Sequence, residues 1–260
     1  MQLTKHHGLG NDFLVAFVDA LPEDAPELAR SLCHRTRGVG ADGLILALPG
    51  DPSAGTDVTM VLFNADGSRA EMSGNGIRCL AQAAVRRQGL GGDLSIGTDA
   101  GIRAVSVEAS NDPVIVQVRV DMGPVRPGPA LESIDYSNSL RFATADMGNP
   151  HLVIQVADVG AVDPAADGPE LSRLAGEVNV EFISPRADGS GIDLRVWERG
   201  VGVTEACGTG ACAAAQAAHN WGLTGTVVQV SMPGGDVRVE LGDTAVLIGP
   251  AAFIATVRYG

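Results

Sequence analysis

The sequence predicts an α+β protein with two pseudo-symmetric domains, each a mostly antiparallel sheet wrapped around a central helix. The main observation is an internal repeat, in which E-M-S-G-N-G-I-R-C-L-A-Q-A-A (71–84) matches E-A-C-G-T-G-A-C-A-A-A-Q-A-A (205–218) at an offset of 134 residues. Each copy is a Gly-x-Gly turn followed by an alanine-rich run, which is typical of a tight turn that leads into a helix. Between the copies, short segments alternate apolar and polar residues, as half-exposed antiparallel strands do.

The first half of the chain is predicted to begin with two strands within residues 1–20, on either side of G-L-G-N-D. A helix over 26–35 and strands over 44–48 and 58–64 follow. The first repeat copy then forms a helix to about residue 88, which G-L-G-G at 89–92 ends. Alternating strands are predicted at 94–98, 102–108 and 114–120.

The second half is predicted to repeat this plan. Strands at 142–147 and 152–156 precede a short helix at 169–175, and strands at 178–184 and 192–198 precede a long helix from Cys207 to about residue 219. Strands at 227–230, 237–241 and 245–248 close this half, and 253–259 returns to the first sheet. Because a turn is predicted at 111–113, we place the N-terminal half-site domain at 1–112, completed by a strand at 252–260, and the C-terminal half-site domain at 113–251.

The composition describes a globular protein that binds a small molecule. Hydrophobic residues make up 45% of the 260 residues and charged ones 19%, which separates the chain from disordered sequences. The net charge of −13 disfavours nucleic acids and anionic membranes, because both select basic surfaces. No leader or bilayer-spanning segment is visible, so we expect a cytoplasmic protein. Its oligomeric state stays open, with a homodimer as one alternative.

The cysteines point to chemistry at one position only. Cys33, Cys79, Cys207 and Cys212 form no C-x-x-C pair, so neither a zinc site nor a disulfide framework is predicted. Three of them are interpreted as small buried residues. Cys207 differs because it lies at the predicted start of a helix, where unpaired N–H groups bind a carboxylate and lower the pKa of a thiol.

Ser73 occupies the place of Cys207 in the first repeat copy. Two such helix starts predict a site that holds a small acid between two reactive side chains. A second match between the halves relates Asn11 to Asn149, each of which directly follows a glycine. The match favours a role of both asparagines in the site over a role in a turn alone. Asn179 within a predicted strand points the same way, because asparagine is disfavoured in strands.

A series of motifs resembles the diaminopimelate epimerase family. The motifs lie in the family's order between residues 5 and 210: K-H-H-G-L-G-N-D-F, R-G-V-G-A-D-G, F-N-A-D-G-S-R-A-E-M-S-G-N-G-I-R-C, G-N-P-H, N-V-E-F and W-E-R-G-V-G-V-T-E-A-C-G-T-G. The resemblance implies epimerisation of LL-diaminopimelate to the meso form by two-base proton transfer, without a cofactor or metal, in lysine and peptidoglycan synthesis. Diaminopimelate is then the partner molecule.

The resemblance also implies roles for individual residues. Ser73 and Cys207 match the two catalytic positions, and His151 and Glu198 match residues that tune the pKa of these groups. The resemblance also implies which residues bind the substrate. Those that hold chiefly its distal end are Asn11, Asn64, Asn149, Asn179 and Arg199. The backbone around Gly74, Asn75, Gly208 and Thr209 holds the reacting carboxylate, and Glu198 is a further substrate-binding residue.

Ser73 departs from the family pattern, which has cysteine there. A hydroxyl is a far weaker acid than a thiol, and a helix start cannot make it an alkoxide at neutral pH. Three explanations are open: a replacement that disables one base, a natural lineage in which serine relays a proton, and a relative that acts on another amino acid as a racemase or elimination enzyme. A catalytically silent amino-acid-binding protein is a further alternative.

Overall fold

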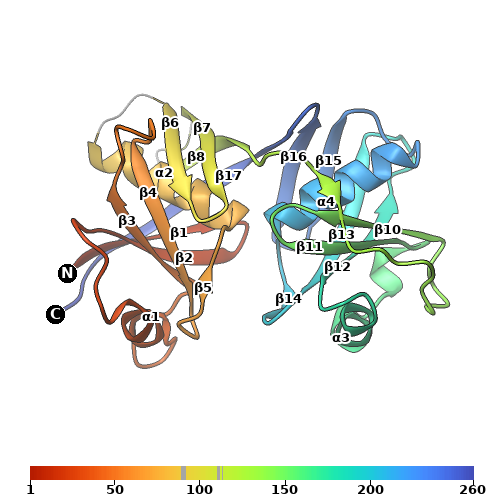
Figure 1. Cartoon of the computed structure of the whole chain (residues 1–260), viewed down its shortest axis with the longest axis horizontal. Coiled ribbons are helices and arrows are strands. Elements are labelled where there is room, and N and C mark those ends of the chain that lie inside the picture. Colours follow the sequence, from red (N-terminus) through yellow and green to blue (C-terminus); the bar gives the residue numbers. More distant parts are fainter. Residues whose placement is uncertain (89–91, 110–111, 113) are drawn as a thin grey trace. The chain divides into compact units, whose positions relative to one another are not determined.

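The computed structural model describes residues 1–88, 92–109, 112 and 114–260, and it divides into two compact units (Figure 1). Unit 1 comprises Met1–Asp121 and Gly249–Gly260, and unit 2 comprises Met122–Ile248. The sequence places the first boundary at 112/113 and the second at 251/252, whereas the units divide after Asp121 and after Ile248. The helix stop predicted at 89–92 and the turn predicted at 111–113 include residues outside the described ranges.

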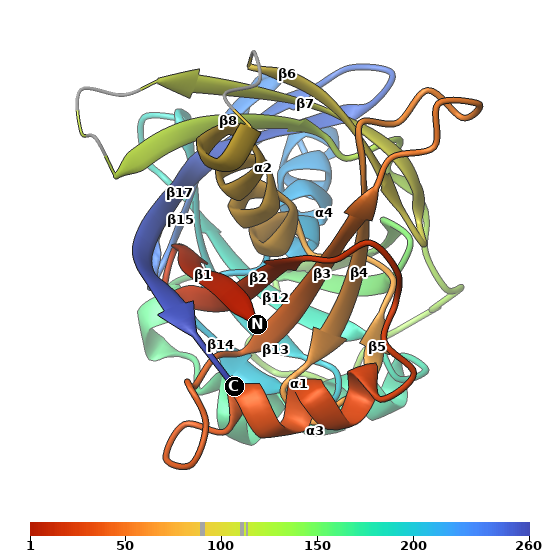
Figure 2. The same cartoon turned by 90° about the vertical axis from the view of Figure 1, so that its left-hand side faces the viewer.

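Unit 1 wraps a curved sheet around its second helix. Its elements are β1 (Gln2–Gly8), β2 (Asn11–Phe17), α1 (Ala25–Cys33), β3 (Gly43–Pro49), β4 (Val58–Asn64), β5 (Arg69–Ala70), α2 (Gly74–Gln88), β6 (Asp93–Thr98), β7 (Gly101–Ala109), β8 (Ile115–Asp121) and the end of β17 (Ala245–Arg258). The pairs β2–β3 and β4–β6 are parallel, while β1–β2, β3–β4, β6–β7 and β7–β8 are antiparallel. Helix α2 runs inside the curve of the strands and α1 lies outside them (Figure 2).

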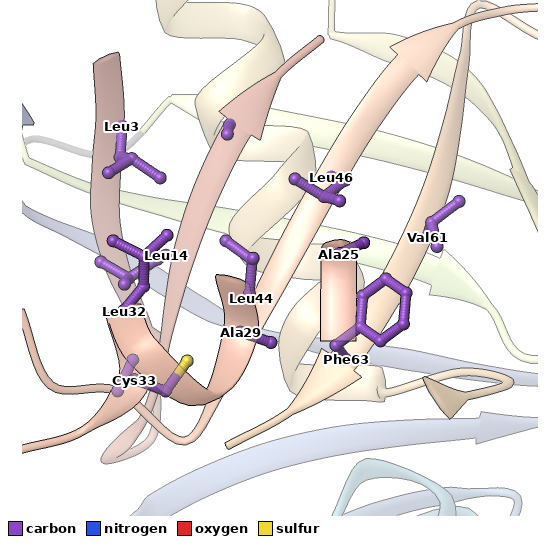
Figure 3. Close-up of a cluster of buried hydrophobic side chains, with 12 residues drawn as sticks. Leu3, Leu14, Ala25, Ala29, Leu32, Cys33, Leu44, Leu46, Val61 and Phe63 are labelled. Carbon is purple, nitrogen blue, oxygen red and sulfur yellow. The ribbon is translucent and has the colours of Figure 1, made fainter. Parts of the chain in front are cut away.

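Helix α1 packs on the outer face of the sheet because its apolar residues share one side. Ala25, Ala29 and Leu32 recur at helical spacing and are buried in one cluster with residues of β2, β3 and β4, among them Leu44 and Phe63 (Figure 3). The sheet is therefore covered on both faces, by α1 outside and by α2 inside. Double coverage explains why β3 and β4 are nearly continuous apolar runs.

The imidazole of His6 in β1 makes the stability of unit 1 sensitive to acid. The ring is buried, its Nδ1 lies 2.8 Å from Gln82 Oε1 of α2, and burial lowers the pKa of His6 from 6.5 to about 4. Because the folded-state pKa lies below the unfolded one, the unfolded chain binds more protons between these pH values. Stability is therefore expected to fall as pH falls from 6.5 to 4, by about 3 kcal/mol for this group.

Urea unfolding at a series of pH values measures this loss. A His6→Gln variant cannot titrate at this position, so its free energy of unfolding should decline less than that of the unmodified chain over the same interval. Equal declines in the two proteins would contradict the prediction.

Unit 2 repeats the plan of unit 1. Its elements are β9 (Arg126–Pro127), β10 (Arg141–Asp146), β11 (Pro150–Gln155), the 3₁₀ turn η1 (Val159–Ala161), α3 (Pro164–Leu174), β12 (Asn179–Pro185), β13 (Gly191–Glu198), β14 (Gly202–Thr204), α4 (Gly208–Asn220), β15 (Val227–Met232), β16 (Gly235–Leu241) and the start of β17. Again two strand pairs are parallel, β11–β12 and β13–β15. Helix α4 packs against the strands in the way α2 does, and α3 corresponds to α1. The predicted α+β class and pseudo-symmetry are confirmed.

Three predicted elements are wrong in extent. Helix α3 begins at Pro164 rather than at 169, because the side chain of Asp163 accepts a hydrogen bond from the N–H of Ala165 and caps the helix start. The strands predicted at 245–248 and 253–259 are one strand, β17. Pro250 does not interrupt it, because it lies between the ladder with β16, which ends at Ile248, and the ladder with β1. In the described part of the chain, no helix is long and apolar enough to cross a membrane.

Candidate active site

The residues predicted for the site fall into two groups, one in each unit. Unit 1 holds Asn11 at the start of β2, Asn64 at the end of β4, and Ser73, Gly74 and Asn75 at the start of α2. Unit 2 holds a larger group at the ends of β11, β12 and β13 and at the start of α4: Asn149, His151, Asn179, Glu198, Arg199, Cys207, Gly208 and Thr209. Each group forms the half-site of its own unit.

Cys207 caps the central helix of unit 2. Its Sγ accepts a hydrogen bond from the N–H of Gly210 at 3.4 Å and lies 3.5 Å from Thr209 Oγ1. The extended backbone of Cys207 (φ −129°) places the sulfur at the first turn, within reach of the N–H of Gly210. The thiol is buried, at 5% exposure. The sulfur therefore accepts from a backbone N–H and contacts a hydroxyl, and a helix start also offers N–H donors to a bound anion.

Burial outweighs these donors in setting the acidity of the thiol. The pKa of Cys207 is raised well above its ordinary value, first by desolvation and then by the carboxylates of Glu198 and Glu181, while Thr209 and Gly210 act in the opposite direction. The helix start does act in the direction that the sequence analysis expected, through the N–H of Gly210, but the net shift of the pKa is upward. The partial charge at a helix end stabilises a thiolate by less than burial and two neighbouring carboxylates destabilise it.

Glu198 responds to the same environment. Its pKa is raised, first by burial, while hydrogen bonds with Thr204 and Cys207 partly offset the shift. The hydroxyl of Thr204 in β14 donates to the carboxylate, so the β13–β14 hairpin holds Glu198 in place. A thiol and a carboxyl group with raised pKa values therefore lie in contact at the end of β13.

A chain of hydrogen bonds connects His151 to this thiol. The Nε2 of His151 lies 3.0 Å from Asn149 Oδ1, and Asn149 Nδ2 donates to Thr209 Oγ1 at 3.4 Å. Thr209 in turn contacts Cys207. On its other side, Nδ1 of His151 lies 2.7 Å from Oε1 of Glu181. The sequence-predicted Asn149, His151, Thr209 and Cys207 are thus brought together.

Asn179 and Arg199 form a second contact in unit 2. The side-chain Oδ1 of Asn179 accepts from the backbone N–H of Arg199 at 2.9 Å, and Arg199 Nη1 donates to the carbonyl of Glu177 at 3.0 Å. Asn179 therefore fixes the turn that follows β13. This gives a reason for asparagine at the start of a strand.

The half-site of unit 1 reproduces the cap with a hydroxyl. Ser73 Oγ accepts from the N–H of Gly76 at 3.0 Å, the counterpart of the Cys207–Gly210 bond. In the first turn of α2, Asn75 Nδ2 donates to Asn11 Oδ1 at 3.2 Å, which parallels the contact of Asn149 with Thr209. Asn64 instead donates to Ser68 Oγ at 3.0 Å.

The sequence analysis missed three buried or partly buried charged residues that support the half-sites. Arg78 is fully buried in α2 and donates to Asn75 Oδ1 and to the carbonyl of Gly74, both at 2.9 Å. Asp42 accepts from Asn11 at 2.9 Å. Glu181 lies two residues after Asn179 in an otherwise apolar strand. A charge flanked by apolar residues within a predicted helix or strand is the signal that could have found Arg78 and Glu181.

No group of three or more His, Cys, Asp and Glu side chains arranged to hold a metal ion occurs among the residues that the structure describes. Each half-site has a side chain with an exchangeable proton, the hydroxyl of Ser73 or the thiol of Cys207, at a helix start, where backbone N–H groups favour an anion.

Comparison with known sequences gives matches over nearly the whole chain. The family described as diaminopimelate epimerase matches residues 3–127 and 143–254. A diaminopimelate epimerase of Desulfitobacterium hafniense is 41% identical, over 98% of this chain and 96% of that protein. One of Desulforudis audaxviator is 43% identical, over 96% of both.

Comparison with solved structures shows the same fold at low sequence identity. A probable proline racemase from Agrobacterium radiobacter K84 has a TM-score of 0.76 and 18% identity, over all of this chain and 92% of that one. A hydroxyproline epimerase from Agrobacterium vitis has a TM-score of 0.71 and 19% identity, over 100% and 89%.

Proposed function

This chain belongs to the diaminopimelate epimerase family, and from that premise we propose that it interconverts LL- and meso-diaminopimelate by moving the α-proton. The reaction makes it an isomerase of lysine biosynthesis. The observation that carries the proposal in the structure is the pair of capped helix starts, with Ser73 on α2 and Cys207 on α4. Inversion of a stereocentre requires a base on one face and an acid on the other, and the resemblance to the family assigns these two roles to the positions of Ser73 and Cys207.

The helix starts also supply what the carbanion needs. An α-proton beside a carboxylate is very weakly acidic, so the negative charge of the intermediate must be stabilised. The backbone N–H groups around Gly74, Asn75, Gly208 and Thr209 lie at the starts of α2 and α4, where N–H groups can stabilise a carboxylate without reorganisation. We assign them to the reacting carboxylate of the substrate.

The remaining predicted residues are assigned to recognition and to tuning. Asn11, Asn64, Asn149, Asn179 and Arg199 hold chiefly the distal end of diaminopimelate, because amides and a guanidinium complement its amino and carboxylate groups. Glu198 contacts both the substrate and Cys207, and with His151 it sets the protonation of the acid–base groups. This assignment rests on the family motifs and on the contacts within each half-site.

The two acid–base groups are unequal in this chain. Cys207 can take up and release a proton as thiolate and thiol, whereas Ser73 serves only as a relay because its hydroxyl does not ionise near neutral pH. We therefore expect Cys207 to exchange the α-proton of one stereoisomer, with slow or no passage to the other.

Incubation of LL- and meso-diaminopimelate separately in deuterated buffer tests this expectation. Mass spectrometry should show deuterium at the α-carbon of one isomer, while circular dichroism shows little conversion. Exchange of neither isomer would refute the proposed function if diaminopimelate also fails to bind. Tight binding without exchange, unaffected by prior alkylation of Cys207, would instead establish the silent amino-acid-binding alternative, which the serine at position 73 favours.

We also propose that the enzyme works in the cytoplasm, needs no cofactor, binds neither nucleic acid nor membrane, and forms a homodimer. The net charge of −13 supports the absence of nucleic-acid and membrane binding, because both select basic surfaces. Light scattering of the purified chain tests the homodimer, and activity after exhaustive dialysis against a chelator tests the absence of a cofactor.

A further inference from the structure

One pair of side chains, on the parallel strands that pack against the central helix, differs in chemistry between the half-sites. In unit 2 the parallel strands β11 and β12 carry His151 and Glu181. The register of the corresponding parallel strands β2 and β3 in unit 1 places Phe13 and Ile45 at the equivalent positions. One half-site therefore contains an acid–base pair where the other has two apolar side chains.

Glycine contacts confirm that the two positions are equivalent. A Cβ added at Gly210 of α4 would meet Glu181 Oε1 at 2.6 Å, and a Cβ added at Gly76 of α2 would meet Ile45 Cδ1 at 3.4 Å. The carboxylate of Glu181 thus lies directly against the first turn of α4. Glycine at position 210 leaves the room that this approach requires.

The buried side chain of Glu181 contacts the ring of His151. Both side chains have 0% exposure, and Nδ1 lies 2.7 Å from Oε1. The other oxygen, Oε2, has no hydrogen-bond partner among the described residues. Because a buried carboxyl group without a hydrogen-bond partner is costly, the contact with Nδ1 fixes both this side chain and the ring of His151.

The other ring nitrogen directs the bonds that lead to the thiol. With a proton on Nε2, His151 donates to Asn149 Oδ1, so that Asn149 Nδ2 faces Thr209 Oγ1. The Thr209 oxygen then accepts from the amide, and its own hydrogen points to Cys207 Sγ, 3.5 Å away. If Nε2 lacked the proton, the amide would turn over and take the threonine hydrogen for itself.

Resting on the proposed function, we propose that Glu181 is a positioning residue that holds the ring of His151 with a proton on Nε2 and thereby directs the Asn149–Thr209 chain so that Thr209 donates to Cys207. Together with the N–H of Gly210, Thr209 then gives the sulfur two donors when it carries negative charge. Glu181 touches neither the thiol nor the substrate-binding residues by a hydrogen bond; it acts through the ring. The titratable groups of this cluster are Glu181, His151, Glu198 and Cys207.

The unmodified protein tests the central claim without any substitution. The ¹⁵N resonances of the histidine rings report which nitrogens carry protons, and loss of one set in a His151→Asn variant assigns the ring. We expect a proton on Nε2 of His151. A ring without a proton on Nε2 would overturn the proposal, whatever the enzyme does with diaminopimelate.

The Glu181→Gln variant tests the functional consequence, with Glu170→Gln as the matched control. Glutamine keeps the size of the side chain, but its amide pairs with either tautomer of the ring, so the proton on Nε2 of His151 is no longer fixed. The kcat for α-proton exchange should fall about tenfold to a hundredfold, as for one lost charge-assisted hydrogen bond, with little change in KM. Glu170 is exposed at the surface of the same unit, with 62% side-chain exposure, and its variant should match the unmodified protein.

The pH profile separates this role from direct electrostatic repulsion. If the ring acts as proposed, the limb of the profile that belongs to Cys207 should move to higher pH in Glu181→Gln, because the sulfur loses a donor. If Glu181 acts only by its negative charge on the sulfur, the limb moves to lower pH and the proposal is overturned. Absence of exchange in the unmodified protein would count against the proposed function, while the ring measurement would still decide the protonation of His151.

Discussion

A Ser73→Cys variant is expected to convert LL-diaminopimelate to the meso form about 10²–10⁴-fold faster than the unmodified chain, the usual contribution of one acid–base group. The site is already shaped for the substitution. Ser73 Oγ accepts from the N–H of Gly76 at 3.0 Å, and a thiol can accept the same bond, as Cys207 does from Gly210. The gain follows from chemistry alone, because a thiol ionises far more readily than a hydroxyl.

Circular dichroism and solvent deuterium uptake, recorded together, measure this gain. A Ser53→Cys variant adds a thiol in an exposed loop and should leave activity unchanged. Equal activity of the serine and cysteine forms would mean that Ser73 works as an acid–base partner in this chain. Inactivity of both forms on diaminopimelate would indicate that the substrate is another amino acid.

A Cys207→Ser variant is expected to lose α-proton exchange by about 10²–10⁴-fold. It would leave a hydroxyl at both helix starts, so neither could take up the α-proton near neutral pH. The fold should be retained, since serine is a good N-cap. Deuterium uptake by each isomer measures the loss.

Cys212→Ala is the matched control, because it removes a buried thiol from the same helix and introduces the best helix former. It should exchange as the unmodified chain does. A double variant, Ser73→Cys with Cys207→Ser, should exchange the opposite stereoisomer. Unchanged exchange in Cys207→Ser would contradict the role of this thiol.

The repeat by itself determined the two central helices and their starts. Helix α2 begins at Gly74 and α4 begins at Gly208, because glycine turns and alanine runs act locally, through backbone freedom and helix propensity. Strand β4 coincides with its prediction for a similar reason, since a buried apolar run has few alternatives. The pairing of the strands could be predicted only as a general plan, because contacts between residues far apart in the sequence decide which strands pair.

The sequence also supplied the residue types of the half-sites, because the family motifs name them one by one. Only the tertiary structure decided how these residues act on one another. It raised the pKa of Cys207 by burying the thiol near two carboxylates, and it joined Glu181 to His151 across neighbouring strands. Burial and strand register depend on the packing of the whole unit, so the acidity of each group is determined by the fold and not by the motif in which the residue lies.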